Sequence, residues 1–338
     1  MLDTIIIYRS CSEGSVDRHN DRPILNKQTG TIPQVNRDSV ISVPEKDRSL
    51  SSKAKIISWD DFNSNGKWDS GEDLVDINKD FKFITIGGSV TETIFKLGFG
   101  RAVIAVDQSS TFPDRVKNLP QVGYIRAIAS EGVLSMIPTK IFTTSDIGPP
   151  NAVSQIKDSG VDIEIFDAPK TVDDIIILID KLSTLLDAKA QRNIVVGEIQ
   201  SDIVKIDNII SNYDKVPSMV FFMNPSSGGY MAAGKGTIAD YLIDLMGGDN
   251  PFSDDFSKYQ RVNKEEILKY DPDIILVASH GGDGKSSLHF TNGSEFKSLK
   301  SVDNRNVIDI SMSNLTMGPS FISNTVSVME KINIGFGK

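Results

Sequence analysis

Residues 84–138 read ITIGGSVTETIFKLGFGRAVIAVDQSSTFPDRVKNLPQVGYIRAIASEGVLSMIP, and short β-branched runs in this stretch alternate with helical runs. Glycine and proline punctuate it, as is typical of a chain that turns between strands and helices. At its centre Tyr124 and Arg126 stand two residues apart. A phenol beside a guanidinium suits a ferric iron carried by an anionic ligand, because tyrosine is a hard oxygen donor and the cation favours the phenolate.

Length and composition predict a globular core and disfavour several classes of function. The chain has 338 residues, of which 39% are apolar, so it can bury a sizeable core and fits two domains. A formal charge of −9 and a pI near 5.0 disfavour nucleic acid or an anionic membrane as a partner. No apolar run reaches the roughly 18 residues of a membrane span. No P-loop, G-x-S-x-G or complete dinucleotide fingerprint occurs, so we expect no enzyme.

Short apolar strands are predicted before and after a long helical segment. The first group covers residues 83–86, 103–106, 141–144 and 163–166, and the second covers 218–223, 274–278 and 307–310. Helical runs between the strands imply parallel sheets with helices on both faces. Residues 171–213 keep apolar side chains at helical spacing without a proline, which predicts a helical bridge.

The predicted fold is therefore α/β: two Rossmann-like lobes with parallel sheets, bridged by a long helix, plus an irregular N-terminal extension. The expected boundaries are a disordered or tethering leader at 1–55, a calcium-loop-like segment at 56–81, an N-terminal lobe at 82–170, a helical bridge at 171–214 and a C-terminal lobe at 215–338. An internal repeat supports two lobes. Glu131 precedes Pro138 and a strand with the same spacing that separates Glu265 from Pro272 and a strand.

A set of short motifs carries a resemblance to a known family. The motifs are IGGSVTETI at 86–94, VDQSST at 106–111, LPQVGYIR at 119–126, MAAGKGT at 231–237 and MGGDN at 246–250. From residue 82 onward the chain resembles the haem-binding substrate-binding proteins of bacterial ABC transporters, in the cobalamin and siderophore binding-protein superfamily. The resemblance implies haem as the transported ligand, a permease and an ATPase as partners, a monomer, and a periplasmic or cell-envelope location. A corrinoid or a ferric siderophore is the alternative ligand.

The resemblance also assigns roles to residues of both lobes. Tyr124 is the expected ligand of the haem iron, and Arg126 either favours its phenolate or pairs with a propionate. Lys235 is a candidate propionate partner, at a position where the family more often has arginine; an ordinary surface lysine is the alternative. His280 falls where a cleft-facing arginine is expected, so it could be a second axial ligand, a hydrogen-bonding partner of the bound ligand, or a solvated turn histidine.

Glu131 and Glu265 are the expected docking residues for the permease, because proteins of this superfamily carry an exposed glutamate on each lobe. Two equivalent anions suit a partner built from two symmetric subunits. The alternative is that both are ordinary carboxylates at helix N-termini, where the helix dipole favours them. Bare metal is disfavoured as the ligand, because only His280 and His289 lie in the lobes.

Cys11 is the single cysteine, which excludes an intramolecular disulfide. The apolar run at 4–7 and the Ser12-Glu13 that follows resemble the end of a bacterial lipoprotein signal, in which Cys11 would carry a lipid anchor. The apolar run is shorter than the roughly 7 to 15 residues of an ordinary signal, and Arg9 stands where a small or apolar residue is expected. A truncated or misassigned start would explain both departures; an unmodified surface cysteine is the alternative.

Residues 61–72 read DFNSNGKWDSGE and fit the calcium-loop pattern D-x-[DN]-x-[DN]-G-x5-E at every specified position. The candidate oxygen donors are Asp61, Asn63, Asn65, Lys67 through its backbone carbonyl, Asp69 and Glu72. No clear helices flank the loop, so we expect a structural calcium site and not a regulatory EF-hand pair. The alternative is a turn rich in Asn, Gly and Asp ahead of the first strand.

Overall fold

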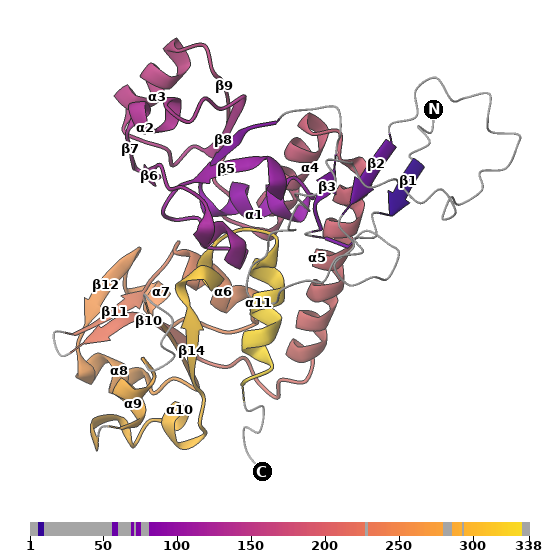
Figure 1. Cartoon of the computed structure of the whole chain (residues 1–338). Helices are drawn as coiled ribbons and strands as arrows, with labels where there is room; N and C mark the ends of the chain where they lie inside the picture. The colour runs from indigo at the N-terminus through magenta and orange to yellow at the C-terminus, as the bar shows by residue number, and fades with distance from the viewer. Residues whose placement is uncertain are drawn as a thin grey trace, which may run out of the picture.

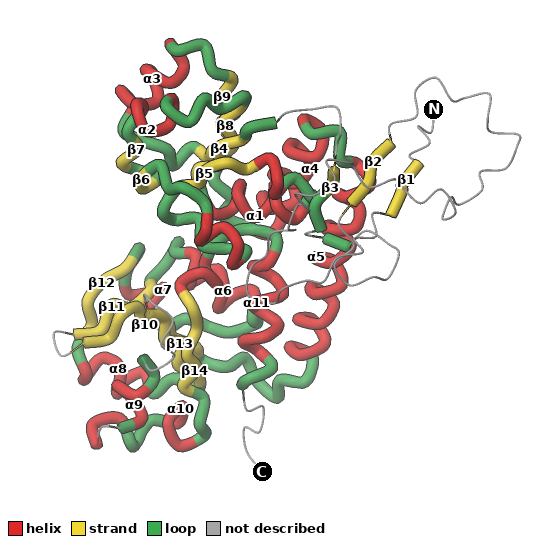
Figure 2. The backbone as a smooth tube through the Cα atoms, in the orientation of Figure 1, coloured by secondary structure: helices red, strands yellow, loops and turns green. Residues whose placement is uncertain are grey.

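The computed structural model describes residues 6–9, 56–59, 69–70, 72–75, 81–226, 229–279, 286–292 and 294–332. Two lobes lie one above the other, and helix α5 (Lys189–Ile210) runs along one side of both (Figure 1). The strands of the two lobes form separate groups (Figure 2). One hydrophobic cluster nevertheless extends from Val90 in the first lobe through Val195 in α5 to Phe221 in the second. The lobes therefore share part of their core.

The N-terminal lobe is built on a parallel sheet of the predicted strands. Its strand order is β5 (Val103–Val106), β4 (Phe83–Ile86), β8 (Lys140–Thr144) and β9 (Asp162–Phe166). All four side chains of the central strand β4 are buried, as expected of a sheet covered on both faces. The lobe also contains α1 (Gly88–Lys96), α2 (Ser130–Leu134), α3 (Pro150–Asp158), and a hairpin of β6 (Gly123–Tyr124) and β7 (Ala127–Ile128).

The C-terminal lobe has a mixed sheet. Its order is β12 (Tyr259–Val262), β11 (Gly229–Ala233), β10 (Met219–Ser226), β13 (Ile274–Ser279) and β14 (Val307–Ser311). β10, β13 and β14 are parallel as predicted, whereas β11 and β12 are antiparallel. The connection from β10 to β11 is too short for a parallel crossover, so it forms a hairpin. The helices of this lobe are α6 (Ile238–Leu245), α7 (Phe252–Asp255), α8 (Lys264–Tyr270), α9 (Leu288–Thr291) and α10 (Lys300–Asp303).

The predicted bridge consists of two helices, α4 (Val172–Leu185) and α5. Thr171 caps α4 by accepting the amide of Asp174, which in turn accepts the amide of Thr171. The helices separate where Asp187 takes a positive φ of 54°. With 22 residues, α5 is about 33 Å long and can pass both lobes. A C-terminal helix, α11 (Ser320–Met329), packs against it.

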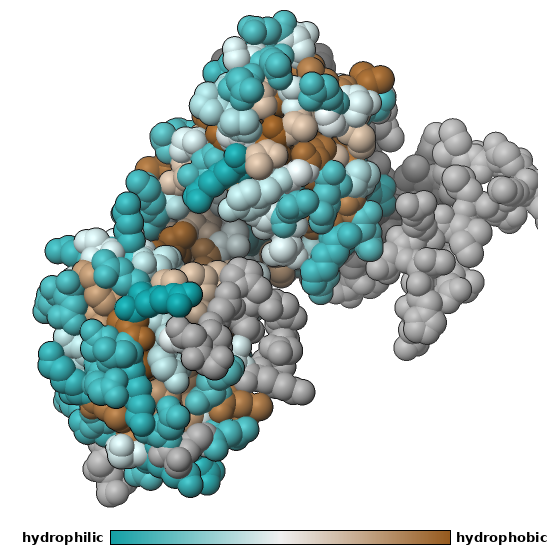
Figure 3. All heavy atoms as spheres, turned by 90° about the vertical axis from the view of Figure 1, so that its left-hand side faces the viewer, coloured by the Kyte–Doolittle hydropathy of each residue, from teal (hydrophilic) through white to brown (hydrophobic). Residues whose placement is uncertain are grey.

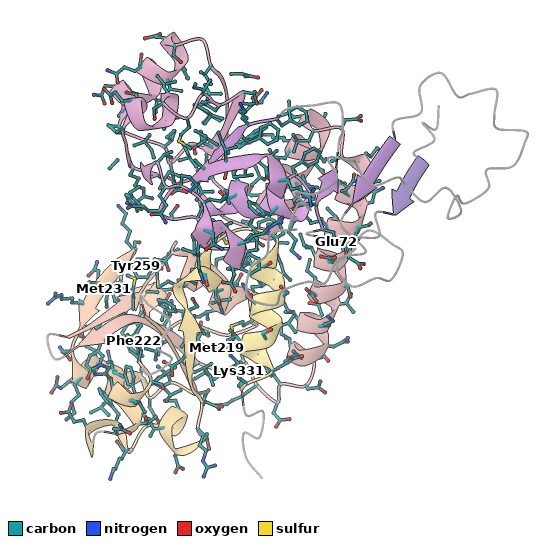
Figure 4. All side chains as sticks on the ribbon, in the orientation of Figure 1. Glu72, Met219, Phe222, Met231, Tyr259 and Lys331 are labelled. Atoms are coloured by element: carbon teal, nitrogen blue, oxygen red, sulfur yellow. The ribbon has the colours of Figure 1, made fainter. Side chains whose placement is uncertain are left out.

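The described part of the N-terminal extension is attached to the first lobe and to α5. β1 (Ile6–Arg9) pairs in parallel with β2 (Ile56–Trp59), which pairs antiparallel with β3 (Leu74–Val75). Just before β3, buried Asp73 accepts two hydrogen bonds from Arg115, at 2.5 and 2.7 Å. Ser70 donates to Glu198 of α5 at 2.7 Å. Glu72 lies beside α5 in Figure 4. Within the described residues, no helix is long and apolar enough to cross a membrane.

Candidate functional site

The two lobes meet where loops that follow their parallel strands come together. A Cβ on Gly88, after β4, would lie 2.9 Å from Cγ2 of Thr316, after β14. On the face shown in Figure 3 the surface is hollowed between the lobes, and apolar atoms are visible within the hollow. Tyr259 and Met231 lie at the edge of the C-terminal lobe that faces the first lobe (Figure 4). This hollow, called the cleft below, lies at the usual ligand position of open α/β sheets.

A buried carboxylate joins the lobes at the base of the cleft. Glu92 of α1 is 2% exposed, and its Oε1 accepts the backbone amide of Ser320, the first residue of α11, at 2.5 Å. Gly318 must lack a side chain, because a Cβ there would collide with Oε2 of Glu92. Burial raises the pKa of Glu92, while the hydrogen bonds to Ser320 and the charge of Lys96 act in the opposite direction. We call the contact of 88–92 with 316–320 the seam.

Tyr124 projects from a hairpin whose neighbouring residues are fixed on both sides. Gln108 donates its amide to the carbonyl of Gly123 at 2.8 Å, and Gly148 donates its amide to the carbonyl of Ile125 at 2.9 Å. Ile125 is buried, whereas Tyr124 is 44% exposed. The hairpin β6–β7 lies on the side of its lobe that faces β11 and β12 (Figure 1). The phenol is thus presented to solvent from a fixed backbone at the edge of the cleft.

Asp107 organises the turns beneath this hairpin. The residue is fully buried and follows β5 directly. Its Oδ1 accepts the amide of Gly87 at 2.8 Å and the hydroxyl of Ser110 at 2.6 Å. Its Oδ2 accepts the amide and hydroxyl of Ser109, at 2.9 and 2.5 Å. The carboxylate therefore joins the first two motifs of this lobe, and the amide of the adjacent Gln108 donates to Gly123 of the third.

Arg126 lies in the turn between β6 and β7, beside Tyr124 in sequence. Its Nη2 is 3.7 Å from Oδ1 of Asp146, and both side chains are about half exposed or more. An exposed pair at this separation contributes little, on the order of a few tenths of a kcal/mol. The guanidinium can therefore exchange Asp146 for an anionic ligand at small cost.

Lys235 belongs to a loop on the opposite side of the cleft. The Lys235 amide donates to the carbonyl of Phe256 at 2.9 Å, and Lys258 donates its amide back to Lys235 at 3.0 Å. The chain passes Phe256 closely, since a Cβ on Gly234 would collide with the Phe256 carbonyl. The Lys235 side chain is exposed. The backbone is thus fixed while the ammonium remains available.

Asp240 holds this second loop. It accepts the amide of Gly236 at 3.0 Å, the side-chain amide of Asn250 at 2.8 Å and the hydroxyl of Ser253. Asn250 also donates to the carbonyl of Ala233 at 3.0 Å. The two motifs of the second lobe, MAAGKGT and MGGDN, are joined in this way.

A separate cavity of about 420 Å³ lies at the other end of α1, between α5 and α11. Lys96, Glu198 and Asp202 are among the residues on its wall. Lys96 Nζ is 3.4 Å from Glu198, so part of this charge is already paired. The wall of this cavity carries charges of both signs, and ligands of open α/β sheets bind at the carboxyl ends of the strands, so the cleft is the better candidate site.

Glu131 and Glu265 occupy equivalent positions, as the sequence repeat predicts. Each lies exposed in the first turn of a helix, α2 and α8, that leads to a parallel strand, β8 and β13. The residue before proline takes a positive φ in both copies, 51° at Ile137 and 43° at Asp271. The repeat is therefore a repeat of structure, and it gives each lobe one exposed carboxylate.

Comparison with known proteins identifies the family. A family model described as periplasmic binding protein matches residues 84–312. The chain belongs to the periplasmic binding protein family. The periplasmic heme-binding protein RhuT from Roseiflexus sp. RS-1 in apo form is 25% identical, with a TM-score of 0.66 over 75% of this chain and 97% of its own. The periplasmic heme-binding protein BhuT in complex with two hemes is 25% identical, with a TM-score of 0.65 over 74% of this chain and 96% of its own.

A second kind of relative also matches this periplasmic binding protein. The vitamin B12-binding protein of Pectobacterium carotovorum subsp. carotovorum (strain PC1) is 24% identical over 196 residues, which are 58% of this chain and 70% of that protein. The relatives thus include proteins named for haem and for a corrinoid. The fold is common to both, so the choice between the two ligands depends on the residues of the cleft.

Several predicted residues of this periplasmic binding protein lie outside the described part of the chain: Cys11, Asp61, Asn63, Asn65, Lys67 and His280. Of the calcium-loop candidates, Asp69 and Glu72 are described, and the Asp69 amide donates to Oε2 of Glu72 at 3.0 Å. Among the described residues, no group of three or more His, Cys, Asp or Glu side chains is placed to hold a metal ion.

The sequence reasoning did not single out Glu92, Asp107 or Asp240. Asp107 had a readable signal, because polar residues at the carboxyl end of a parallel strand lie at the ligand edge of the sheet. Glu92 is a charged residue in the middle of a helix whose other residues, apart from the terminal Lys96, are apolar or small, which also indicates a special contact. Asp240 gave no comparable signal, since an acidic residue in the first turn of a helix is common.

Proposed function

We propose that this periplasmic binding protein is the haem-binding component of a bacterial ABC haem-uptake system, and that it delivers its ligand without chemistry. The exposed phenol of Tyr124, on a hairpin fixed at both neighbouring residues, carries the proposal. A ligand atom on a fixed backbone reaches iron with little loss of conformational entropy. The likeness to haem-binding proteins at 25% identity supports the same ligand.

The side chains of the cleft have complementary roles in this proposal. Tyr124 donates its phenolate oxygen to ferric iron. Arg126 leaves its loose contact with Asp146 and pairs with the phenolate or a propionate. Lys235 contributes a second cation from the opposite lobe, as a point charge without the bidentate geometry of arginine. His280 is proposed, from sequence alone, as a second axial ligand or a hydrogen-bonding partner.

Titration of the purified protein with haemin tests the proposal. We expect a Soret band together with a phenolate-to-iron charge-transfer band, and we expect Tyr124→Phe to remove the second band and weaken affinity by about 100-fold or more. Tyr270→Phe is a matched control, since Tyr270 lies in the C-terminal lobe and donates its hydroxyl to Asp255. If the wild type does not bind haemin, or if Tyr124→Phe leaves the spectrum unchanged, the proposal is wrong.

A corrinoid is the second candidate ligand, because relatives of this chain are named vitamin B12-binding proteins. The same titration with cyanocobalamin separates the candidates. Saturable binding of cyanocobalamin that Tyr124→Phe does not affect, with no response to haemin, would replace haem by a corrinoid and keep the transport role. A ferric siderophore forms the third arm of the experiment.

Docking on a permease is proposed to use Glu131 and Glu265. Both carboxylates are exposed at equivalent positions of the two lobes, so they can meet matching cations on two permease subunits. The double variant Glu131→Gln/Glu265→Gln should keep haemin affinity and lose stimulation of transport in vesicles that contain the permease and ATPase. Full transport by the double variant would contradict docking through these residues.

Two proposals for the N-terminal region depend on sequence alone. A lipid on Cys11 would tether the protein in the cell envelope, and mass spectrometry of the protein from its native host tests this directly. Calcium bound by residues 61–72 would stabilise the extension. A melting temperature that is the same in calcium and in chelator would remove the calcium proposal.

A further inference from the structure

We infer that Asp107 is a positioning residue for Tyr124: it fixes the backbone that presents the phenol to its ligand. The inference depends on the proposed function only for the identity of that ligand. Asp107 is 0% exposed and lies outside the cleft surface, so it acts through other residues. Its carboxylate is the common acceptor of two turns that follow neighbouring strands, β4 and β5.

The first path from Asp107 to Tyr124 is through backbone hydrogen bonds. The carboxylate fixes Ser109 through both its amide and its hydroxyl. Gln108 is held between Asp107 and Ser109, and its amide donates to the carbonyl of Gly123 at 2.8 Å. Gly123 immediately precedes Tyr124. Loss of the carboxylate should therefore free the segment that aligns β6.

The second path is through packing. Oδ1 of Asp107 accepts the amide of Gly87, which has a φ of 109°. A Cβ on Gly87 would lie 3.2 Å from Cδ1 of Ile125, so the Gly87 turn forms the floor on which Ile125 packs. Ile125 immediately follows Tyr124. The residues on both sides of the phenol thus depend on the same carboxylate.

Four donors converge on Asp107, so the position requires a carboxylate and not the amide of asparagine. The four are two backbone amides and two hydroxyls. A carboxylate is an acceptor at both oxygens, whereas an asparagine amide has one acceptor and one donor. In Asp107→Asn the NH₂ group would face amide or hydroxyl donors at one of the two positions. The substitution conserves shape, so its effect reports the lost acceptor.

Hydrogen exchange of the ligand-free protein gives the first test. In Asp107→Asn we expect the amides of Val122, which directly precedes β6, and of Ile128 in β7 to exchange at least about tenfold faster, because both bind carbonyls elsewhere in the lobe. Asp114→Asn is the matched control, because Asp114 is exposed and pairs only locally with Lys117 at 2.7 Å. If Asp107→Asn does not fold, Ser109→Ala removes a single hydroxyl donor and should give a smaller change of the same kind.

The haemin complex gives the second test. With affinity still measurable, Asp107→Asn should shift or broaden the Tyr124-dependent charge-transfer band, because a misplaced phenolate changes the iron–oxygen geometry. Unchanged exchange in the hairpin, or an unchanged band beside a lowered melting temperature, would show that Asp107 is merely structural and overturn the inference. If the wild type ignores haemin, the proposed ligand is wrong, and the exchange experiment alone decides the role of Asp107.

Discussion

In the N-terminal lobe the amide of Gly87, at a φ of 109°, donates to Asp107, which lies 20 residues further along the chain. In the C-terminal lobe the amide of Gly236, at a φ of 77°, donates to Asp240, four residues further. The side of the cleft with the hairpin β6–β7 is called the first wall, and the side with the Lys235 loop is called the second wall. In both walls an aspartate accepts the amide of a glycine that has a positive φ. The glycine of the first wall is bound to an aspartate that follows a neighbouring strand of the sheet, whereas the glycine of the second wall is bound to an aspartate in the first turn of the helix that comes next in the chain.

The two walls differ in the sequence separation of these hydrogen bonds, and we expect them to differ also in how precisely they must position a ligand. On the proposed function Tyr124 is a ligand to iron, which needs a fixed position because coordination bonds tolerate little displacement, and the neighbours of Tyr124 are held from two sides. A cation that pairs with an anion tolerates a larger displacement than a ligand to iron does. The ammonium of Lys235 is exposed at the end of a flexible side chain. We infer that the first wall sets which ligand binds and the second adjusts how tightly it binds.

The largest effect should come from crowding the two glycines. Gly87→Ala should lower the free energy of unfolding by about 2 to 3 kcal/mol, because the φ is unfavourable and Ile125 and Thr144 are close to the new methyl group. Gly236→Ala should cost about 1 kcal/mol, since the φ is unfavourable but no atom lies within 4 Å of the new Cβ. Urea unfolding of both variants measures the difference.

Gly132→Ala is the control for this pair. Gly132 lies inside α2, and a Cβ added there would have no atom within 4 Å, so alanine should raise stability by up to about 1 kcal/mol. Equal losses of stability for Gly87→Ala and Gly236→Ala would contradict the view that the turn at Gly87 is packed more tightly than the turn at Gly236.

Much of the fold was predictable because it depends on local pattern. The seven predicted strands correspond to β4, β5, β8, β9, β10, β13 and β14, since buried parallel strands read as short apolar runs. β11 and β12 were missed, because β11 is rich in glycine and alanine and the polar Gln260 and Arg261 lie in the middle of β12. The break between α4 and α5 was missed because Asp187 takes a positive φ without glycine, which no spacing reveals.

The candidate site was predictable only in part. Tyr124, Arg126 and Lys235 were selected by resemblance, and the fold places the hairpin β6–β7 on the side of its lobe that faces β11 and β12 (Figure 1). The residues that hold them were not predicted. Asp107 accepts from two turns, at Gly87 and at Ser109–Ser110, and Glu92 accepts an amide 228 residues away. The local sequence can mark Asp107 and Glu92 as unusual positions, but their partners depend on the tertiary structure.

If the proposed function is correct, substitutions of Lys235 in the second wall should change haemin affinity by an intermediate amount. Lys235→Arg should tighten haemin binding by about threefold to tenfold, because a guanidinium can pair with a propionate through two hydrogen bonds. Lys235→Met should weaken binding by about the same factor, more so at low ionic strength. Both variants should keep the Tyr124-dependent absorption band. A change in that band would mean that the second wall also determines iron ligation.

The smallest effect should come from the seam that holds the walls together, and its signature is pH dependence. Because burial raises the pKa of Glu92, the folded state binds its proton more tightly than the unfolded chain does. The stability associated with protonated Glu92 is fully present below its ordinary pKa of 4.5 and is lost as pH rises through the raised value.

Glu92→Gln cannot ionise and keeps an oxygen that can accept the amide of Ser320. Its stability relative to the wild type should therefore increase between acidic and neutral pH, measured by urea unfolding across that range. A pH-independent difference between the two proteins would mean that Glu92 does not change its protonation state at the seam, and that the walls are held by packing of Gly88, Thr316 and Gly318 alone.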